Sequence, residues 1–179
     1  MNQAGLAPRD VIQANRPISA VTSEWDFTRV DFKGRMTGHI EPQRSTFHDS
    51  VMIVHGPVGL PNETIDPDHL PPLGGSMRCE KLEFAHQSKG PNQPKDYQQL
   101  VGWGNAQIEG RGFYANADEI SFDGSKGLYM LRAHGNQSAT IAQDTDQGTR
   151  REASGRRIEF IPSTRTVKVD WANGATGSP

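Results

Sequence analysis

Several histidines and carboxylates stand close enough in the sequence to suggest a metal site or acid–base chemistry. His48 and His55 flank one apolar stretch, and the segment 66–69, Asp-Pro-Asp-His, carries three possible ligands. A metal site requires ligands that converge in space and are oriented by hydrogen bonds of their own. The sequence contains neither a His-Glu-x-x-His motif nor a Cys-x-x-Cys pair. We therefore expect solvated loop residues here, and we predict no metal and no cofactor.

Two further patterns fail as catalytic or calcium-binding motifs. The segment 144–148, Asp-Thr-Asp-Gln-Gly, begins like a calcium-binding loop, but the twelfth position is Gly155, which has no side chain to chelate an ion. Ser50, Ser121 and Ser138 all lack the glycine-flanked turn that exposes a nucleophilic serine. We therefore predict no catalytic residue and do not expect an enzyme.

Basic residues gather in the last third of the chain. They are Arg150, Arg151, Arg156, Arg157, Arg165 and Lys168. Two interpretations remain open: a solvated strand face, or contact with the phosphates or carboxylates of an anionic glycolipid. For the second we assign Arg150 and Arg156 as head-group residues. Nucleic acid is not expected as a partner, because no tyrosine or tryptophan is interleaved with these arginines and the net charge is only −2.

One eight-residue pattern recurs along the chain and must position any functional side chain. Its copies begin at positions 77, 115 and 153, a spacing of 38 residues, and each ends in an aliphatic residue, a polar residue and a phenylalanine. A small residue (Cys79, Ala117 or Gly155) stands five positions before each phenylalanine. Such a period is typical of one supersecondary unit that buries its apolar face against its neighbours. The lone Cys79 is accordingly expected to be a buried free thiol.

A glycine–asparagine pair precedes the later two copies, at 104–105 and 135–136. We read each pair as a turn followed by a short strand. Within each copy the small residue and the later aliphatic residue have opposite parity, so a regular strand would place them on opposite faces. Either a β-bulge or a corner at which the strand crosses between two sheets would bring both inside, and we favour the corner.

The composition indicates an all-β protein. Hydrophobic residues make up only 34% of the chain, which also contains 19 Gly and 12 Pro, as expected for many turns and a thin core. No helical periodicity and no run of about 18 apolar residues is present. We predict a flexible N-terminal arm over 1–20, a single β-roll domain over 21–174 with a proline-rich insertion at 56–75 outside the sheet, and a tail over 175–179. Residues 1–16 lack the apolar core of a secretory signal, which leaves open a cytoplasmic protein or a fragment.

The order of a Gly-Asn turn, a strand, an alanine-rich strand ending in an aromatic residue, and a turn is carried by residues 104–108, 115–122, 123–124, 128–131 and 135–136. This order resembles the OstA-like, or LptA-like, family of lipopolysaccharide-transport proteins. The resemblance covers residues 100–174 well and 47–84 loosely. It implies a flattened, taco-like β-jelly roll with an apolar groove that shields acyl chains, in the periplasm or cell envelope, and no catalytic residues. It also implies rolls that stack end to end.

Alternation predicts an inward-facing apolar set. Its members are Val51, Ile53, Leu82, Phe84, Trp103, Ile108, Ile120, Phe122, Met130, Ile141, Ile158, Phe160 and Val169. The residues expected to line a lipid groove are Phe84, Ile108, Ile120, Phe122, Met130, Ile141, Ile158 and Phe160. Ordinary core is the alternative reading of the same set.

Three functions follow as hypotheses. The first is a non-enzymatic roll that binds a lipid or a lipopolysaccharide-like glycolipid. The second is a filled structural module that binds no lipid and joins other β-roll chains by edge-strand pairing, because an open edge at 167–171 would expose unpaired backbone groups. The third is a carbohydrate-binding or sugar-processing β-protein.

Overall fold

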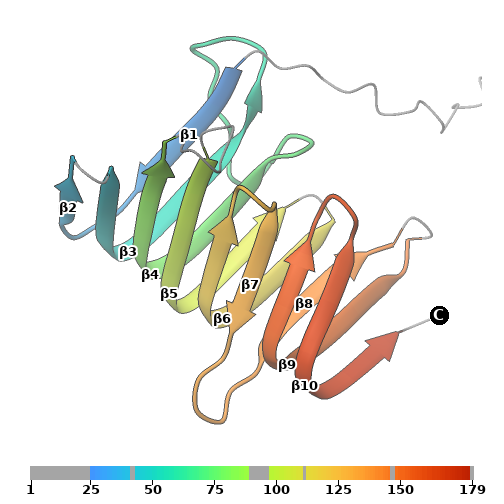
Figure 1. Cartoon of the computed structure of the whole chain (residues 1–179). Coiled ribbons are helices and arrows are strands. Elements are labelled where there is room, and N and C mark those ends of the chain that lie inside the picture. Colours follow the sequence, from blue (N-terminus) through green and yellow to red (C-terminus); the bar gives the residue numbers. More distant parts are fainter. Residues whose placement is uncertain (1–24, 41–42, 89–96, 111, 146–147, 178–179) are drawn as a thin grey trace, which may run out of the picture.

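The computed structural model describes residues 25–40, 43–88, 97–110, 112–145 and 148–177, and within these ranges the chain forms only strands and turns (Figure 1). The strands are β1 (Trp25–Asp31), β2 (Met36–His39), β3 (Arg44–Val58), β4 (Gly75–Gln87), β5 (Tyr97–Gly110), β6 (Phe113–Asp123), β7 (Leu128–Arg132), β8 (Ala139–Asp144), β9 (Arg150–Ile161) and β10 (Thr166–Gly177). The prediction of an all-β, flattened, taco-like roll is confirmed. In the described ranges no helix is long and apolar enough to span a bilayer.

All ten strands belong to one antiparallel sheet whose order nearly follows the chain. The path is β1-β3-β4-β5-β6-β7-β9-β10, with β2 added beside β3. The short strands β7 and β8 together take the place of one long strand between β6 and β9, because β6 and β9 each pair with β8 along their first halves and with β7 along their second. The sheet is therefore a meander of long strands.

The sheet is folded along a line that crosses the middle of the long strands (Figure 1). Register shifts mark this line between His48 and Val51 in β3, between Arg78 and Lys81 in β4, and between Trp103 and Ala106 in β5. Left-handed backbone lies on the same line, at Asp49, Ser50, Gly104 and Asn105. Such irregularities bend a strand sharply, and their alignment across neighbouring strands folds the whole sheet.

The fold line divides the sheet into two walls. The front wall contains β2, β7 and residues 44–48, 81–87, 97–103, 119–123, 157–161 and 166–170. The back wall contains β1, β8 and residues 51–58, 75–78, 106–110, 113–117, 150–155 and 174–177. The bend predicted at the small residues is present, with Cys79, Ala117 and Gly155 buried at or beside the line. It arises from bulge-type register shifts within one continuous sheet and not from a crossing between two sheets, which corrects the favoured form of the prediction.

Both glycine–asparagine pairs lie where the chain passes from one wall to the other. Gly104 (φ 80°) and Asn105 (φ 47°) lie inside β5 and bend it, so the prediction of a turn between two strands is wrong at this position. A β-carbon on Gly104 would lie 2.7 Å from the β-carbon of Glu80, which leaves no room for a larger residue. Gly135 (φ 62°) lies in the β7–β8 connection, where the predicted turn is present.

The three copies of the repeat occupy equivalent positions in the front wall. Strand pairing aligns one inner row of Ser45, Phe84, Leu100, Phe122, Tyr129, Phe160 and Val167. The next row towards the fold line contains Phe47, Leu82, Gly102, Ile120, Leu131, Ile158 and Val169. Each repeat thus contributes its aliphatic residue to one row and its phenylalanine to the other.

Side chains fill the interior next to the fold line. Leu82, Ile120, Leu131 and Ile158 have no exposed surface. Met77 of the back wall occupies the space that Gly102 leaves on the front wall, since a β-carbon on Gly102 would lie only 2.7 Å from its sulfur. The two walls are therefore in direct contact at this depth.

The proline-rich segment lies on the outside of the back wall. β3 continues through Pro57 to Val58, so the segment is narrower than the predicted insertion 56–75 and lies between β3 and β4. Proline is tolerated at position 57 because β4 pairs with β3 only as far as His55, and beyond that point β3 pairs with β1 alone. Ile65 of the segment is buried against Val54 and Val58 in a second, smaller core.

The predicted limits of the domain meet the structure only in part. The arm over 1–20 lies outside the described residues. β10 pairs with β9 as far as Gly177, so the strand passes the predicted boundary at 174 into the predicted tail.

Candidate functional site

A cavity of about 610 Å³ opens between the two walls on the side away from the fold line. Its apolar lining comes from both walls: Ile53, Met77, Ile108 and Phe113 from the back, and Leu100, Phe122, Tyr129 and Phe160 from the front. The cavity crosses the strands, because its lining runs from β1 and β3 at one end to the turn after β9 at the other. Five strand spacings of about 4.8 Å separate β3 from β9, which gives a groove about 24 Å long.

Aromatic rings narrow this groove near β6 and β9. Phe113 of the back wall meets Phe160 of the front wall edge-on, with ring centroids 4.9 Å apart. Tyr129 lies 6.0 Å from Phe113 and 4.6 Å from Phe122, measured between centroids. The ring of Phe113 lies over Gly110, where a β-carbon would come within 2.2 Å of it. Gly110 therefore allows Phe113 to reach across the groove.

Polar groups lie at both ends of the groove. At the β1–β3 end, Thr28 Oγ1 and His55 Nδ1 are 2.8 Å apart, a hydrogen-bond distance. At the other end lie Gln143, Asp144 and Arg165. The groove thus has an apolar middle and polar ends, which is the general form of a site for an amphiphile.

Seven of the eight predicted groove residues separate into three groups. Ile108, Phe122 and Phe160 line the cavity. Ile120, Ile141 and Ile158 are buried in the packed interior, where both walls already contact them. Phe84 lies in the same inner row as Phe122 and is half-buried, but it does not line the cavity.

The predicted inward orientation of Met130 and Trp103 is wrong. Met130 pairs with Ser121 and Glu159 on the outer face of the front wall, while its neighbour Leu131 faces inward. Trp103 also faces outward, where its Nε1 donates a hydrogen bond to Glu119 at 3.2 Å and the ammonium of Lys81 lies 4.7 Å from its ring centroid.

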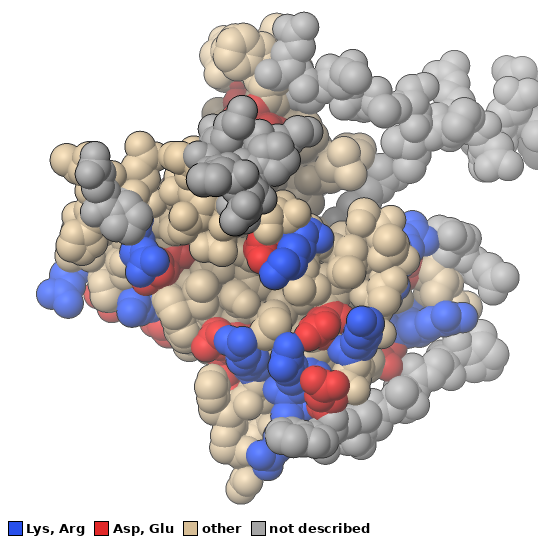
Figure 2. All heavy atoms as spheres, viewed as in Figure 1, with Lys and Arg blue, Asp and Glu red and all other residues tan. Residues whose placement is uncertain are grey.

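The outer face of the front wall carries charges of both signs. One row of paired residues contains His48, Lys81, Trp103, Glu119, Arg132, Arg157 and Asp170. Glu119 bonds Arg132, and Arg157 lies 2.6 Å from Glu159 and 3.8 Å from Asp170. Figure 2 shows the two signs interleaved over this face. The solvated strand face is the better of the two interpretations for Arg157, because carboxylates offset its charge.

The structure does not bring Arg150 and Arg156 together at the groove. Arg150 begins β9 opposite Asp144, with its Nε 3.8 Å from Glu152. Arg156 is exposed at the fold line, which is the closed edge of the groove. Six positions of strand put about 20 Å between them. A shared head-group site for this pair is not formed.

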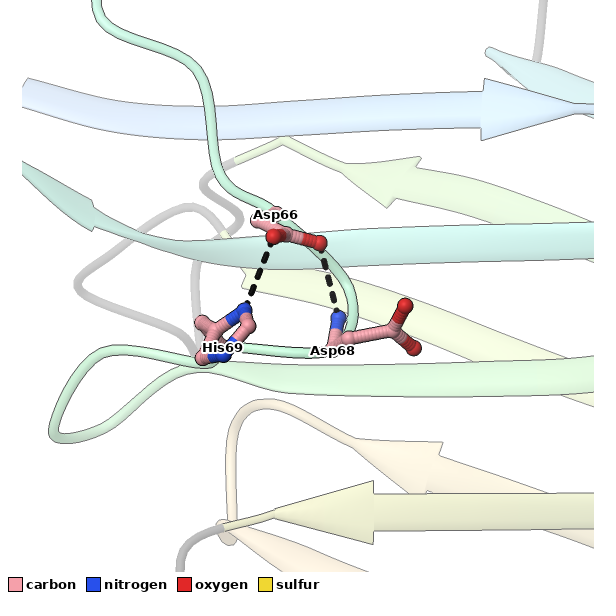
Figure 3. A network of polar contacts seen from close by, with 3 residues as sticks. All are labelled: Asp66, Asp68 and His69. Atoms are coloured by element: carbon pink, nitrogen blue, oxygen red, sulfur yellow. Dashed lines mark hydrogen bonds and ion pairs between the residues drawn. The ribbon is translucent and has the colours of Figure 1, made fainter.

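The segment 66–69 forms a local turn. His69 Nδ1 lies 2.9 Å from Asp66 Oδ2, and Asp66 Oδ1 accepts a hydrogen bond from the backbone N–H of Asp68 at 3.0 Å (Figure 3). The bond to His69 holds the pKa of Asp66 below its usual value, and the same bond raises the pKa of His69. The carboxylate of Asp68 points away from the other two side chains (Figure 3). Among the described residues no group of three such side chains is placed to bind a metal ion.

Two groups, the buried Cys79 and the half-buried Tyr129 of the groove lining, have strongly raised pKa values. Burial raises the pKa of the Cys79 thiol to about 12. Burial likewise raises the pKa of Tyr129 to about 12. At neutral pH both groups are uncharged, which keeps the interior and the groove lining free of anionic groups at these positions.

Several groove residues escaped prediction from the sequence. Leu100 and Tyr129 stand directly opposite Phe122 in the inner row, so strand pairing of the repeat would have found them. Phe113 and Thr28 stand outside the repeat, and only the folded geometry assigns them to the cavity. His55 was considered as a metal ligand, whereas its place is at one end of the groove.

No family model matches this chain, and no curated protein matches it.

Proposed function

We propose that this protein binds the acyl chain of a lipid or glycolipid in the groove between its walls, without catalysing a reaction. The single observation that carries the proposal is the open apolar cavity of about 610 Å³, which stays unfilled although the interior beside it is tightly packed. Binding pockets for small molecules commonly have volumes of about 300–1,000 Å³ and a mostly apolar lining.

The shape of the groove favours one extended chain. A volume of about 610 Å³ spread over a length of about 24 Å leaves a narrow passage. The rings of Phe113 and Phe160 narrow it further. Most of the polar side chains that line the cavity lie at its two ends, so an apolar chain in the middle would not cover them.

The resemblance to the OstA-like family adds a biological setting to this proposal. On this resemblance we propose the periplasm or cell envelope as the setting and a lipopolysaccharide-like glycolipid as the ligand. The third hypothesis, carbohydrate binding, has less support, because Trp103 is covered by Lys81 and bonded to Glu119, so its ring is not free to stack on a sugar.

Displacement of a fluorescent fatty acid, cis-parinaric acid, by saturated fatty acids of increasing length and by lipid A tests the proposal. Each buried methylene contributes about 0.8 kcal/mol, so Kd should fall about fourfold per added carbon and level off when the chain fills the groove. Phe122→Asp should abolish binding, whereas Ser121→Asp, one residue away on the outer face, should leave it intact. Thermal melting of both variants checks that each is folded.

No saturable binding of either lipid class would exclude the proposal and leave the structural module as the remaining function. One observation favours that second candidate. In the described part of the chain, β10 pairs only with β9 and β1 pairs only with β3, so each offers a free backbone edge to another β-roll chain. A molar mass that rises with concentration in light scattering would support edge pairing, and a constant monomer mass would exclude it.

A further inference from the structure

His55 stands at the end of the groove, and one of its ring nitrogens is hydrogen-bonded to a neighbouring strand. Its Nδ1 lies 2.8 Å from the hydroxyl oxygen of Thr28 on the neighbouring strand. Among the described residues its Nε2 has no hydrogen-bond partner, although His55 lines the cavity. The bond to Thr28 fixes the orientation of the ring without using the second nitrogen.

The space beside His55 is open because the next residues in its row lack side chains. Strand pairing continues the row from Thr28 and His55 to Gly75, Gly110 and Phe113. Phe113 folds over Gly110, so the uncovered stretch is the one at Gly75, directly opposite His55. The apolar middle of the groove therefore begins beside the imidazole.

We propose that His55 is the head-group residue of this groove and that the ligand is a single-chain amphiphile ending in an anionic oxygen group. This inference rests on the proposed function and adds to it the direction in which the ligand lies. The acyl chain runs from His55 past Met77 and Leu100 towards Phe122 and Tyr129. Thr28 is a positioning residue that acts through His55.

The tautomers of His55 explain why the head group should be a hydrogen-bond acceptor. In the neutral ring, a Thr28 hydroxyl that donates to Nδ1 leaves the proton on Nε2. In the protonated ring, Nδ1–H donates to the same hydroxyl oxygen, and Nε2–H is again free to donate. The protonated ring and this neutral tautomer thus both present a donor to the ligand, and an anionic acceptor favours them over the tautomer that carries its proton on Nδ1. A carboxylate or a phosphate oxygen meets it with a charge-assisted hydrogen bond.

The opposite end of the groove is less suited to an anionic head. Arg165 lines that end and already interacts with another group. The carboxylate of Asp144 lines the same end and would repel an anion. Asp26, the one acidic residue that strand pairing places on the inner face of β1, is exposed two positions beyond Thr28, opposite Pro57.

The test compares twelve-carbon ligands that differ only in the head: dodecanoate, dodecyl phosphate and dodecanol, each measured by displacement of cis-parinaric acid at pH 7.5. A charge-assisted hydrogen bond should make the two anions bind at least about tenfold more tightly than dodecanol. His55→Leu should remove this preference and leave dodecanol binding unchanged. Thr28→Val should reduce the preference in part, and His69→Leu, which removes an exposed loop histidine, should have no effect.

Three other outcomes each contradict a different statement, and a fourth would specify the head group. Equal binding of the anions and dodecanol by the unaltered protein overturns the head-group role of His55 and leaves lipid binding in place. Loss of the anion preference in Arg165→Leu together with its retention in His55→Leu overturns the direction of the ligand. No displacement by any of the three ligands overturns both this inference and the proposed function. A preference for dodecyl phosphate over dodecanoate identifies a phosphorylated lipid as the source of the head.

Discussion

Phe113 of β6 and Phe160 of β9 meet across the groove, with ring centroids 4.9 Å apart, although their strands belong to different walls at these positions. This contact connects the two walls on the side away from the fold line. Met77 and Gly102 connect the same walls near the fold line. Together these two contacts fix the distance between the walls of the groove. The predictions below on Phe160, on Gly102 with Met77, and on Tyr129 concern residues that set this distance or line the space.

Phe160→Ala should lower the free energy of unfolding by about 3–5 kcal/mol, because the side chain is only 2% exposed and meets Phe113. Phe84→Ala removes the same side chain at the equivalent, half-buried position of another repeat and should cost about 1–3 kcal/mol. Urea unfolding of both variants measures the difference. Equal costs would mean that the contact between the walls contributes nothing to stability.

Gly102→Ala should destabilise the protein by about 1–3 kcal/mol, because the new β-carbon would lie 2.7 Å from the sulfur of Met77. Met77→Ala in the same chain should recover part of this loss, since it removes the colliding atom. Gly38→Ala is the matched control: its nearest atom would be 3.5 Å away, in ordinary contact, and stability should change little. A double-mutant cycle without coupling between Gly102 and Met77 would contradict the packing described.

The Cys79 thiol should not react with Ellman's reagent at pH 8 in the folded protein. Burial raises its pKa to about 12, so almost no thiolate is present, and the side chain is only 6% exposed. One equivalent should react once urea unfolds the chain. Rapid modification in native buffer would show that the fold line opens to solvent.

Stability should decrease as the pH rises above about 9. In the unfolded chain a cysteine ionises near 8.5 and a tyrosine near 10, whereas Cys79 and Tyr129 in the folded protein ionise only at about 12. Between these values the unfolded state loses protons that the folded state retains, so alkali favours unfolding. Urea midpoints at pH 8 and pH 10.5 measure the effect, and Tyr129→Phe should make it smaller. If the urea midpoint of Tyr129→Phe fell as much between the two pH values as that of the unaltered protein, ionisation of Tyr129 would not contribute to the effect.

Ile65→Ala should release the proline-rich segment without unfolding the sheet. Ile65 is 5% exposed and packs on Val54 and Val58, outside the main core. Limited proteolysis should therefore cut between β3 and β4 in this variant while the rest of the chain stays intact. Leu60→Ala removes a side chain of the same segment that is 63% exposed, and it should leave the cleavage rate unchanged.

The repeat could be predicted from the sequence because residues at equivalent positions of its copies lie in the same rows of the folded sheet. Ile120 and Ile158 stand 38 positions apart in the sequence. They occupy one inner row because both pair with Leu131 of β7, which lies between them. The ending of each copy, an aliphatic residue, a polar residue and a phenylalanine, indicates that the first and third side chains share the inner face. The position of the bend could also be predicted, because the parity of the apolar residues changes within each copy at the small residue.

The orientation of Met130 could not be predicted from the same parity argument. The turn between β6 and β7 pairs Asp123 with Leu128, so Tyr129 and Leu131 face inward and Met130 faces outward. Turn length alone decides this, and one residue more or fewer would reverse it. Trp103 was misassigned for a related reason: it directly precedes the left-handed Gly104 and Asn105, where β5 changes its alternation. The existence of the open groove could not be predicted either. It depends on the distance between the two walls, and the pattern of a single strand does not determine this distance.

The order of the strands has a consequence for how the chain folds. Because almost every strand pairs with its neighbour in the sequence, most of the sheet closes through short loops. A pair such as β4–β5 can form before the rest and serve as a template for the next strand on either side, as in repeat proteins whose folding spreads from one unit to another. β9 pairs with both β7 and β8, and these two short strands must first be in place on β6. We therefore expect docking of β9 to be the late, rate-limiting step, visible as slowed refolding in Ile158→Val and unchanged refolding in Ile53→Val.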